Sequence, residues 1–481
     1  MDIYIKNIGI VKESTIQLDG LTVIAGKNNS GKTTVGKVLY SLLDAVSSIK
    51  EKVLSDRKSY ISKQLYNVES ALEVLELCMR SIARYNKEAE FMDSALYQLF
   101  SDHRRNTEGI ERLAHQVYEE LKAFSLSETS ISEEAERYFK LFIRDGDGDK
   151  ESILDYLKKQ IDNAIIILDN AFANLEKDPE LIQYAKESIQ QTLLAEFSEQ
   201  IQPVRNPDAI SSIRVFNDGN TCFSMEIKDN RITTEDRTYF VSPCQKVYLI
   251  DDPFVLDNTI IARSVKPRAS EYSDIVSILN TDRVFAHNEK LKRVLRFKAK
   301  PSILEKTIID ESLKPIRERI NSVLPGQFEF SQEGNYYVHS GMKLHVSNLA
   351  TGSKMFSLIK LLLDIGELDN TTMLILDEPE AHLHPMWQNV FAEVIVLLAK
   401  ELGVRILLTT HSPNFMLAID AYMRKYSFAE KTNFYQTDTD EEGFVTYRCV
   451  NNNMDLIYGD FLKYLSDVKN LRDSYLYGTG E

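Results

Sequence analysis

The sequence predicts an α/β fold in which a mixed sheet with flanking helices is split by a large helical insertion. Short apolar runs typical of buried parallel strands lie at Leu21–Ala25, Met373–Leu376 and Val404–Leu408, and a polar motif follows each run. From residue 37 to 178 the chain has no proline and only three glycines. Since proline and glycine usually mark loops and strand ends, their scarcity there favours long helices.

These patterns divide the chain into six segments. We expect residues 1–44 to begin the sheet and 45–205 to form the helical insertion, with 206–265 returning to the sheet. A helical segment at 266–325 precedes the part that holds the later motifs, 326–430, and residues 431–481 form a hairpin and a final helix.

Alternating or continuous apolar residues between turn signals predict the individual strands. The expected strands are 3–8, 15–18, 21–25, 213–216, 222–227, 238–241, 246–250, 328–330, 336–339, 343–346, 373–376 and 404–408, with a hairpin at 433–450. Helices are expected to begin near 351 and to span about 455–476.

The first motif, GKNNSGKTT, matches the phosphate-loop pattern G-x-x-x-x-G-K-[ST]. Backbone N–H groups of such a loop converge on phosphates, and the helix that follows directs its positive end at them. Lys32 is expected to reach the β- and γ-phosphate oxygens, and the Thr33 hydroxyl is placed for Mg²⁺. The predicted ATP-binding residues are Gly26, Lys27, Asn28, Asn29, Ser30, Gly31, Lys32, Thr33 and Thr34.

The second and third motifs, LILDEPEAH and TTHSP, place polar residues where open α/β sheets bind ligands. We expect Asp377 to hold Mg²⁺ through water and Glu378 to polarise the attacking water. His411 is placed to sense the γ-phosphate. A DE pair or a lone histidine is common by itself, but three motifs in this order predict an enzyme that hydrolyses ATP with Mg²⁺.

Composition limits the class of protein. The four cysteines form no CxxC pair, which argues against a zinc site or a disulfide framework and fits a reducing cytoplasm. We expect no leader and no membrane span, because the N-terminus lacks a charged leader and no run approaches about 20 apolar residues.

The net charge of −15 means that any contact with nucleic acid requires a local basic patch or a partner. One candidate patch is the run Lys290, Lys292, Arg293 and Arg296. The simpler reading, a solvated helix face, is favoured over a phosphate or partner contact.

Four segments together carry a family resemblance: IKNIGI at the start, GKNNSGKTT, LDEPEAHLHP and TTHSP. They resemble the ABC-type ATPases of the RecF, SMC and OLD group, and within it the anti-phage ATPases such as the OLD nucleases and PtuA of the Septu system. The resemblance implies an ABC-type P-loop ATPase head. It also implies a homodimer or higher even oligomer, with ATP between the phosphate loop of one subunit and the signature motif of the other.

The same resemblance assigns two further segments. The signature candidate has alanine where the family has serine, so Thr351 or Ser353 supplies that contact or turnover is slow. A D-loop is implied just after the second motif, although His384 there fits an ordinary helix start equally well, and Gln245 is only a weak candidate for the Q-loop glutamine. The implied residues are Ala350, Thr351, Gly352, Ser353 and Lys354 in the signature, and Glu380, Ala381 and His382 in the D-loop.

The residues after His411 leave no room for the TOPRIM nuclease domain of OLD proteins. We therefore expect the ATPase subunit of an anti-phage defence complex, which regulates or delivers a separately encoded HNH-type nuclease. A retron reverse transcriptase with its nucleic acid is left open as a partner. The alternative is an SMC/RecF-like DNA-repair or DNA-clamp ATPase; the ATPase subunit of a membrane transporter is disfavoured, because such subunits lack the long helical insertion.

Overall fold

The structure is a computed structural model that describes residues 1–47, 49–72, 75–76, 95–100, 109–124, 150–175, 181–234, 242–259, 286–297, 303–331, 334–451, 453 and 455–476. The described residues form two compact units. Unit 1 contains residues 1–47 and those from Leu181 onward, and unit 2 contains those from 49 to 175. The strand expected at 238–241 lies outside the described residues.

Unit 2 is helical where the structure describes it, as the scarcity of proline and glycine predicts. Its helices are α2 (Ile49–Ala71), α5 (Ala95–Phe100), α6 (Ile110–Ala123) and α8 (Lys150–Leu175). Apolar residues at helical spacing, such as Ile61, Val68, Val117, Leu157 and Leu168, form its buried core. The insertion is shorter than expected, because α9 (Leu181–Glu196) packs against α1 (Lys32–Val46) in unit 1.

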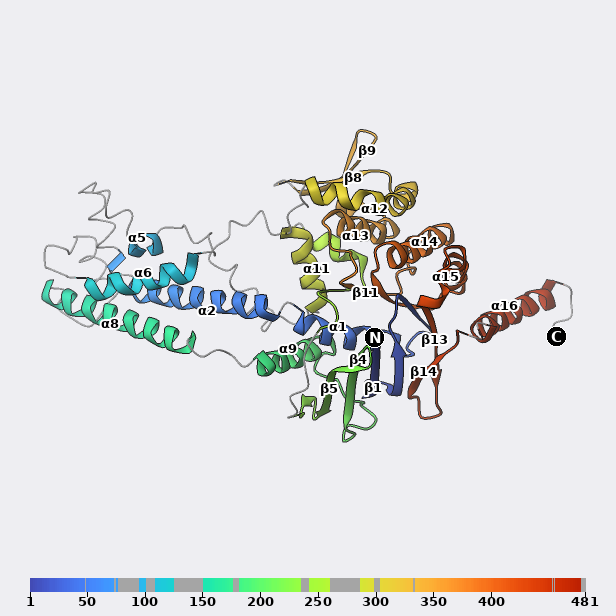
Figure 1. The fold of residues 1–481 in the computed structure, drawn as a ribbon, viewed down its shortest axis with the longest axis horizontal. Coiled ribbons are helices and arrows are strands. Elements are labelled where there is room, and N and C mark those ends of the chain that lie inside the picture. The colour runs from blue at the N-terminus through green and yellow to red at the C-terminus, as the bar shows by residue number, and fades with distance from the viewer. Residues whose placement is uncertain are drawn as a thin grey trace. The chain divides into compact units, whose positions relative to one another are not determined.

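Unit 1 is built on an 11-stranded mixed sheet with the order β6-β5-β4-β1-β2-β14-β13-β3-β12-β11-β7 (Figure 1). From β13 to β7 all neighbours are parallel, and from β6 to β2 all are antiparallel. The strands are β1 (Asp2–Ile8), β2 (Val11–Gln17), β3 (Leu21–Ala25), β4 (Ser211–Asn217), β5 (Asn220–Lys228), β6 (Arg231–Ile232), β7 (Lys246–Ile250), β11 (Thr372–Asp377), β12 (Arg405–Thr410), β13 (Thr432–Thr439) and β14 (Val445–Cys449).

Every residue of β3 is buried, because helices cover both faces of the parallel half. In β2 buried and exposed residues alternate over its second half, as expected where one face meets solvent. The α/β class with a mixed sheet and flanking helices is confirmed.

The C-terminal hairpin lies inside the sheet. β13 pairs in parallel with β3, and β14 meets β2 at Val445 and Val11, so the hairpin joins the two halves. The sequence predicts the hairpin and the final helix, α16 (Asp455–Leu476), but not this central place. A separate three-stranded antiparallel sheet contains β8 (Gln327–Ser331), β9 (Gly334–His339) and β10 (Met342–His345).

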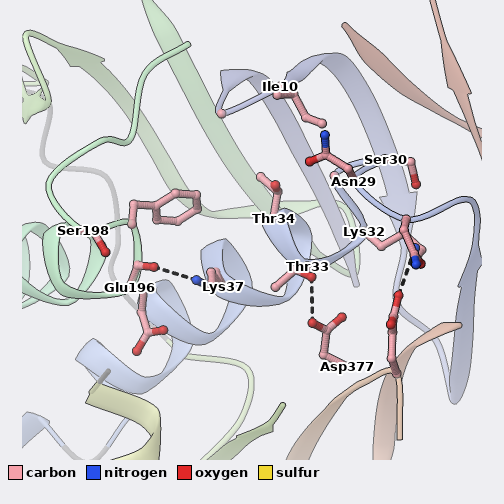
Figure 2. A pocket seen from close by; sticks show the side chains of 15 residues that line it. Ile10, Asn29, Ser30, Lys32, Thr33, Thr34, Lys37, Glu196, Ser198 and Asp377 are labelled. Atoms are coloured by element: carbon pink, nitrogen blue, oxygen red, sulfur yellow. Dashed lines mark hydrogen bonds and ion pairs between the residues drawn. The ribbon is translucent and has the colours of Figure 1, made fainter. Parts of the chain in front are cut away.

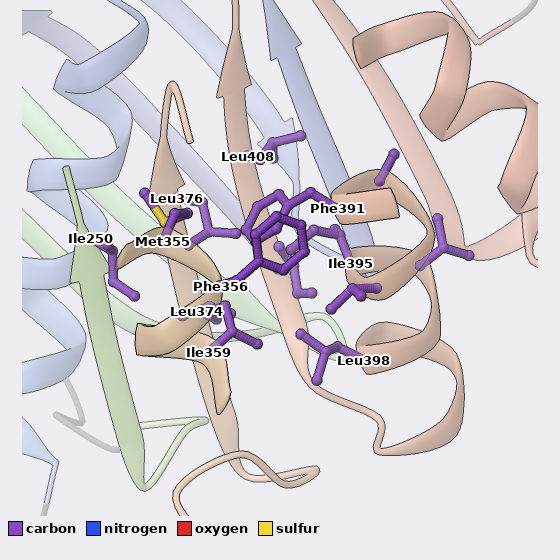
Figure 3. Packing of buried hydrophobic residues seen from close by; sticks show 14 of the residues in the cluster. Ile250, Met355, Phe356, Ile359, Leu374, Leu376, Phe391, Ile395, Leu398 and Leu408 are labelled. Atoms are coloured by element: carbon purple, nitrogen blue, oxygen red, sulfur yellow. The ribbon is translucent and has the colours of Figure 1, made fainter. Parts of the chain in front are cut away.

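The main core lies between the parallel strands and the helices on one face. Phe356 of α13 (Thr351–Asp364) and Phe391 of α14 (Pro385–Glu401) meet edge to face at 5.1 Å, over Leu374 and Leu408 (Figure 3). α1 packs on the opposite face, where Gly36 lies against Ile375. The other elements are α11 (Ala286–Phe297), α12 (Ile303–Val323), α15 (Pro413–Lys425), η3 (Pro253–Thr259), η5 (Val346–Asn348) and η6 (Ala429–Lys431).

None of the helices searched, over the described part of the chain, combines the length and the apolar composition needed to cross a membrane.

Candidate nucleotide-binding site

The three sequence motifs meet at one edge of the sheet. β3, β12 and β11 are adjacent and parallel, with Thr410 beside Ala25 and Asp377 beside Thr409. Their carboxyl ends therefore lie together, and each is followed directly by one motif. Because the three strands are parallel neighbours, the segments that begin at residues 26, 377 and 411 lie together at one site.

The phosphate loop connects β3 to α1, and its lysine folds back over it. Lys32 is only 4% exposed. Its Nζ donates to the backbone carbonyls of Gly26 at 3.1 Å and Lys27 at 2.6 Å, and lies 3.1 Å from Oε1 of Glu378 (Figure 2). Gly31 precedes the helix with φ 71°, the left-handed region that glycine adopts without strain. The buried cation is thus held at the start of α1, where backbone N–H groups also gather.

Thr33 and Asp377 form the second part of the site. The Thr33 hydroxyl donates to Oδ2 of Asp377 at 2.7 Å, and the Thr409 hydroxyl donates to Oδ1. Burial raises the pKa of Asp377, although the hydrogen bonds from Thr409 and Thr33 oppose this effect. A hydroxyl beside a buried carboxylate is an oxygen-rich pair of the kind that Mg²⁺ prefers, so these residues fit the metal.

The Glu378 carboxylate lies between a lysine and a histidine. Oε1 is 3.1 Å from Lys32 Nζ, and Oε2 is 3.1 Å from His411 Nδ1. The Glu378 backbone has φ 48°, unusual for a residue with a side chain, and its N–H donates to the carbonyl (3.2 Å) and hydroxyl (3.1 Å) of Thr409. A strained backbone held by two bonds fixes the direction of this carboxylate.

A cavity of about 510 Å³ opens beside these groups, a volume typical of small-molecule and cofactor sites. Figure 2 shows that side chains from α1, α9 and the sheet edge surround it. Its lining residues are Gly9, Ile10, Asn28–Thr34, Lys37, Glu196, Phe197, Ser198, Asp377 and Glu378.

A family model described as an AAA ATPase domain matches residues 1–416. The chain belongs to this family. The match spans the phosphate loop, both later motifs and the helical insertion. A comparison with curated proteins finds no match.

Solved structures that resemble this ATPase include SMC head domains. The SMC head of Thermotoga maritima shares 10% identity, with a TM-score of 0.33, and the alignment covers 93% of this chain and 98% of that one. An SMC head bound to the C-winged-helix domain of ScpA shares 11% identity with a TM-score of 0.36, and the alignment covers 95% of this chain and 98% of that one. The SMC head of Pyrococcus furiosus has an extended coiled coil and is bound to the C-terminal domain of ScpA. It shares 10% identity with a TM-score of 0.31, and the alignment covers 97% of this chain and 98% of that one.

The C-terminal hairpin supplies support to the phosphate loop that the sequence does not reveal. The Thr437 hydroxyl donates to Ser30 Oγ at 3.0 Å, and the Tyr447 hydroxyl donates to the Gly31 carbonyl at 2.7 Å. Burial raises the pKa of Tyr447, which therefore stays neutral and a donor. Alternating apolar residues mark 432–449 as strands, but no local signal indicates that they neighbour the ATPase loop.

Gly26→Ala is expected to weaken ATP binding by about tenfold or more, because moving the loop loses hydrogen bonds from its N–H groups to charged phosphate oxygens, each worth about 1.5–3 kcal/mol. A Cβ at Gly26 would lie 2.0 Å from Thr437 Oγ1 and 2.7 Å from Ser30 Oγ, so the loop or the hairpin must move. Calorimetric titration with ATP checks this. Gly109→Ala is the control, because no atom of the described residues lies within 4 Å of a Cβ placed there. Equal affinities in both variants would contradict the predicted displacement.

The signature candidate begins α13, and its lysine is already paired. Lys354 Nζ donates to Asp257 Oδ2 at 2.7 Å and to the Ser347 carbonyl at 2.9 Å, and lies 4.8 Å from the centre of the Phe254 ring. Its side chain is only 3% exposed. Of the residues assigned to the signature, Gly352, Ser353 and Lys354 are buried in their own subunit, whereas Ala350 is exposed and Thr351 is half-buried at the helix start.

Lys354→Met is expected to lower the free energy of unfolding by about 2–3 kcal/mol, near the low end for a broken buried ion pair because Asp257 is 28% exposed. Urea denaturation measures the loss. Lys343→Met is the control, since Lys343 is 49% exposed and pairs with Glu329 across 3.4 Å, so its removal should cost less than about 1 kcal/mol. Similar losses in the two variants would show that the buried Lys354–Asp257 pair stabilises the fold no more than an exposed ion pair does.

The segment assigned to the D-loop contacts both neighbouring motifs. Burial raises the pKa of Glu380; its Oε1 accepts from the Thr410 hydroxyl and, at 3.3 Å, from the His411 N–H. The chain then turns, and the His382 carbonyl packs against Gly352, where a Cβ would lie 2.9 Å away. His384 is the N-cap of α14, and its Nδ1 accepts from Met386 N–H at 3.3 Å. Of the two readings of His384, the helix start is the one with a contact.

Two further candidates lie away from this edge. Gln245 precedes β7, so it stands at the opposite end of that parallel strand from the phosphate loop, and its N–H donates to Thr371. It is therefore not placed to act at this site.

The basic run lies on α11, where two of its lysines are paired within the chain. Lys290 Nζ donates to Asp44 and to the Val247 carbonyl, and Lys292 lies 2.7 Å from Glu289. Arg293 is exposed, and the side chain of Arg296 is outside what the structure describes.

Proposed function

We propose that this chain binds ATP with Mg²⁺ in the cavity at the phosphate loop and hydrolyses it at a site completed by a second copy. The observation that carries this proposal is the Glu378 carboxylate, aimed by its backbone between Lys32 and His411 and next to the Thr33–Asp377 pair. A carboxylate, a lysine and a metal-fitting pair at one edge are the parts that phosphoryl transfer to water requires.

The roles follow from the contacts. Lys32 exchanges the carbonyls of Gly26 and Lys27 for phosphate oxygens when ATP enters, and the loop N–H groups bind the same phosphates. Thr33 and Asp377 would hold Mg²⁺, which supplies charge neutralisation to the phosphates when bound. Glu378 accepts the proton of the attacking water, and His411 keeps the carboxylate oriented.

The second copy contributes the start of its α13 to this site. Backbone N–H groups there bind the γ-phosphate together with the hydroxyl of Thr351, which replaces the serine that the resemblance expects at position 350, because Ser353 is buried in its own subunit. Lys354 does not take part, because Asp257 and Ser347 already occupy its ammonium group. Ala381 and His382 are exposed and lie at the dimer interface, and Glu380, buried behind them, accepts a hydrogen bond from the His411 N–H of its own subunit.

In biological terms, we propose an ATPase subunit of a cytoplasmic anti-phage complex that controls a separately encoded HNH-type nuclease. Direct action on nucleic acid is the less favoured role, since the net charge is −15 and Lys290 and Lys292 are paired within the chain. Support for the nuclease partner comes from the form of the motifs alone.

The test is to purify tagged Glu378→Gln protein with ATP from cells that carry its own operon, and to identify what co-purifies by mass spectrometry. A stoichiometric nuclease is the expected result. An ATP-dependent homodimer with DNA only, together with DNA-stimulated hydrolysis that falls steeply as salt rises, would instead establish a DNA clamp.

A further inference from the structure

A buried histidine contacts two carboxylates, one of which belongs to a residue that lines the ATP cavity. His287 on α11 is 1% exposed. Its Nδ1 lies 2.7 Å from Glu196 Oε2, and its Nε2 lies 3.0 Å from Asp251 Oδ1. The His287 backbone N–H also donates to Glu196 Oε1 at 3.1 Å. An ionised carboxylate only accepts, so a ring that donates to two of them carries protons on both nitrogens and is a cation.

The charges around the ring favour this state. Burial alone would lower the pKa of His287, but the hydrogen bonds and charges of Asp251 and Glu196 outweigh it and raise the pKa to about 9. Tyr40 meets the ring edge to face at 5.8 Å. Other titratable and charged groups on the elements packed here include Lys37 and Asp44 on α1, Tyr248 on β7, and Lys290 and Arg293 on α11.

One carboxylate belongs to a residue that lines the ATP cavity, and the other follows a strand that ends beside the site. Glu196 ends α9 and lines the cavity with Phe197 and Ser198, and its carbonyl accepts from the cavity residue Lys37 at 2.9 Å (Figure 2). Asp251 directly follows β7, whose last residue Ile250 pairs with Leu376 of β11. Asp251 and Asp377 are therefore neighbours at the ends of adjacent parallel strands, about 5 Å apart in the backbone.

The chain beyond Asp251 leads to the segments proposed to face the second copy. η3 begins two residues later; its Phe254 contacts the His382 ring at 6.2 Å, and its Asp257 pairs with Lys354. A shift at Asp251 would therefore reach the signature helix as well as Asp377, its neighbour at the end of β11.

We propose that His287 is a positioning residue of the ATP site, where its buried cation ties the cavity wall at Glu196 to the end of β7 at Asp251. Without the cation two carboxylates would face each other with no counter-charge between them and move apart. This inference rests on the proposed hydrolytic function of the same site. It adds a group that touches neither ATP nor metal and acts only through Glu196 and Asp251.

His287→Gln is the direct test, because glutamine keeps a donor but not the charge. We expect kcat for ATP to fall by about 10- to 100-fold, as for a slightly misplaced site. The Kd for ADP, measured by calorimetry, should change by less than about threefold, since Lys32 and the loop N–H groups are untouched. Asp251→Asn keeps the His287–Glu196 pair, and it should also lower kcat for ATP while leaving the Kd for ADP almost unchanged. This variant carries the test if His287→Gln fails to fold.

The pH profile separates positioning from mere stability. The folded pKa of His287 is raised above the ordinary value of 6.5, so the stability it contributes is complete below pH 6.5 and is lost as pH rises through about 9. Wild-type kcat should fall with a midpoint near pH 9, and His287→Gln should lack that step.

Glu393→Gln is the matched control, since Glu393 is a buried carboxylate paired with Lys425 at 2.8 Å, away from the cavity. It should lower Tm without lowering kcat. The inference is overturned if His287→Gln keeps wild-type kcat and the step near pH 9, or if Glu393→Gln loses as much kcat for the same loss of Tm. A wild-type protein with no hydrolysis at all would instead refute the proposed function.

Discussion

Glu378→Gln is expected to lower ATP turnover by about 10²- to 10⁴-fold, the usual contribution of a general base. The amide has nearly the same shape but cannot accept the proton of the attacking water. Binding should persist, because Lys32, Thr33 and the loop N–H groups keep their places. Phosphate release gives kcat, calorimetry gives Kd, and light scattering should detect a dimer that persists with ATP.

Glu401→Gln serves as the control, since Glu401 is a partly exposed glutamate at the end of α14. It should hydrolyse ATP at the wild-type rate. Wild-type turnover in Glu378→Gln would remove Glu378 from the role of base. Equal loss of binding and turnover would show instead that this carboxylate acts mainly by holding Lys32.

Lys32→Ala is expected to abolish ATP binding and hydrolysis together. The cation is buried, bonded to two loop carbonyls and paired with Glu378, so no exposed group can replace its charge at the phosphates. A charge-assisted hydrogen bond in such a site contributes about 1.5–3 kcal/mol, and Lys32 can make more than one. Titration with ATP and ADP measures the loss.

Lys12→Ala removes a comparable charge from an exposed position, where Lys12 pairs with Asp440 at 2.8 Å. It should bind ATP normally. Thermal melting of Lys32→Ala must show a folded protein, since α1 packs on the sheet through other residues. A folded Lys32→Ala variant with wild-type affinity would disprove the assignment of the phosphate loop.

The sequence could predict those parts of the site that follow from local order. Gly26–Thr34 and His411 come directly after buried strands and Asp377 ends one, and parallel strands end at the same edge. The α/β class follows from the same runs. No knowledge of long-range packing is needed to bring these motifs together.

The remaining contacts depend on pairs that no local pattern reveals. His287 meets Glu196 and Asp251 across 91 and 36 residues, and Tyr447 meets Gly31 across 416. Lys354 reads as part of a nucleotide-binding motif in the sequence, yet its partner Asp257 lies 97 residues away. Such partners are fixed by tertiary packing, which periodicity and composition do not encode.

The central place of the C-terminal hairpin has a consequence for biosynthesis. β3 gains its neighbour β13 only when Thr432–Thr439 has been made, roughly 20–80 s after Leu21 at ordinary elongation rates. Until then one edge of β3 has unpaired backbone groups that other chains could join. We therefore expect the nascent protein to depend on chaperones, and chains that stop before residue 432 to aggregate even though they contain all three ATPase motifs.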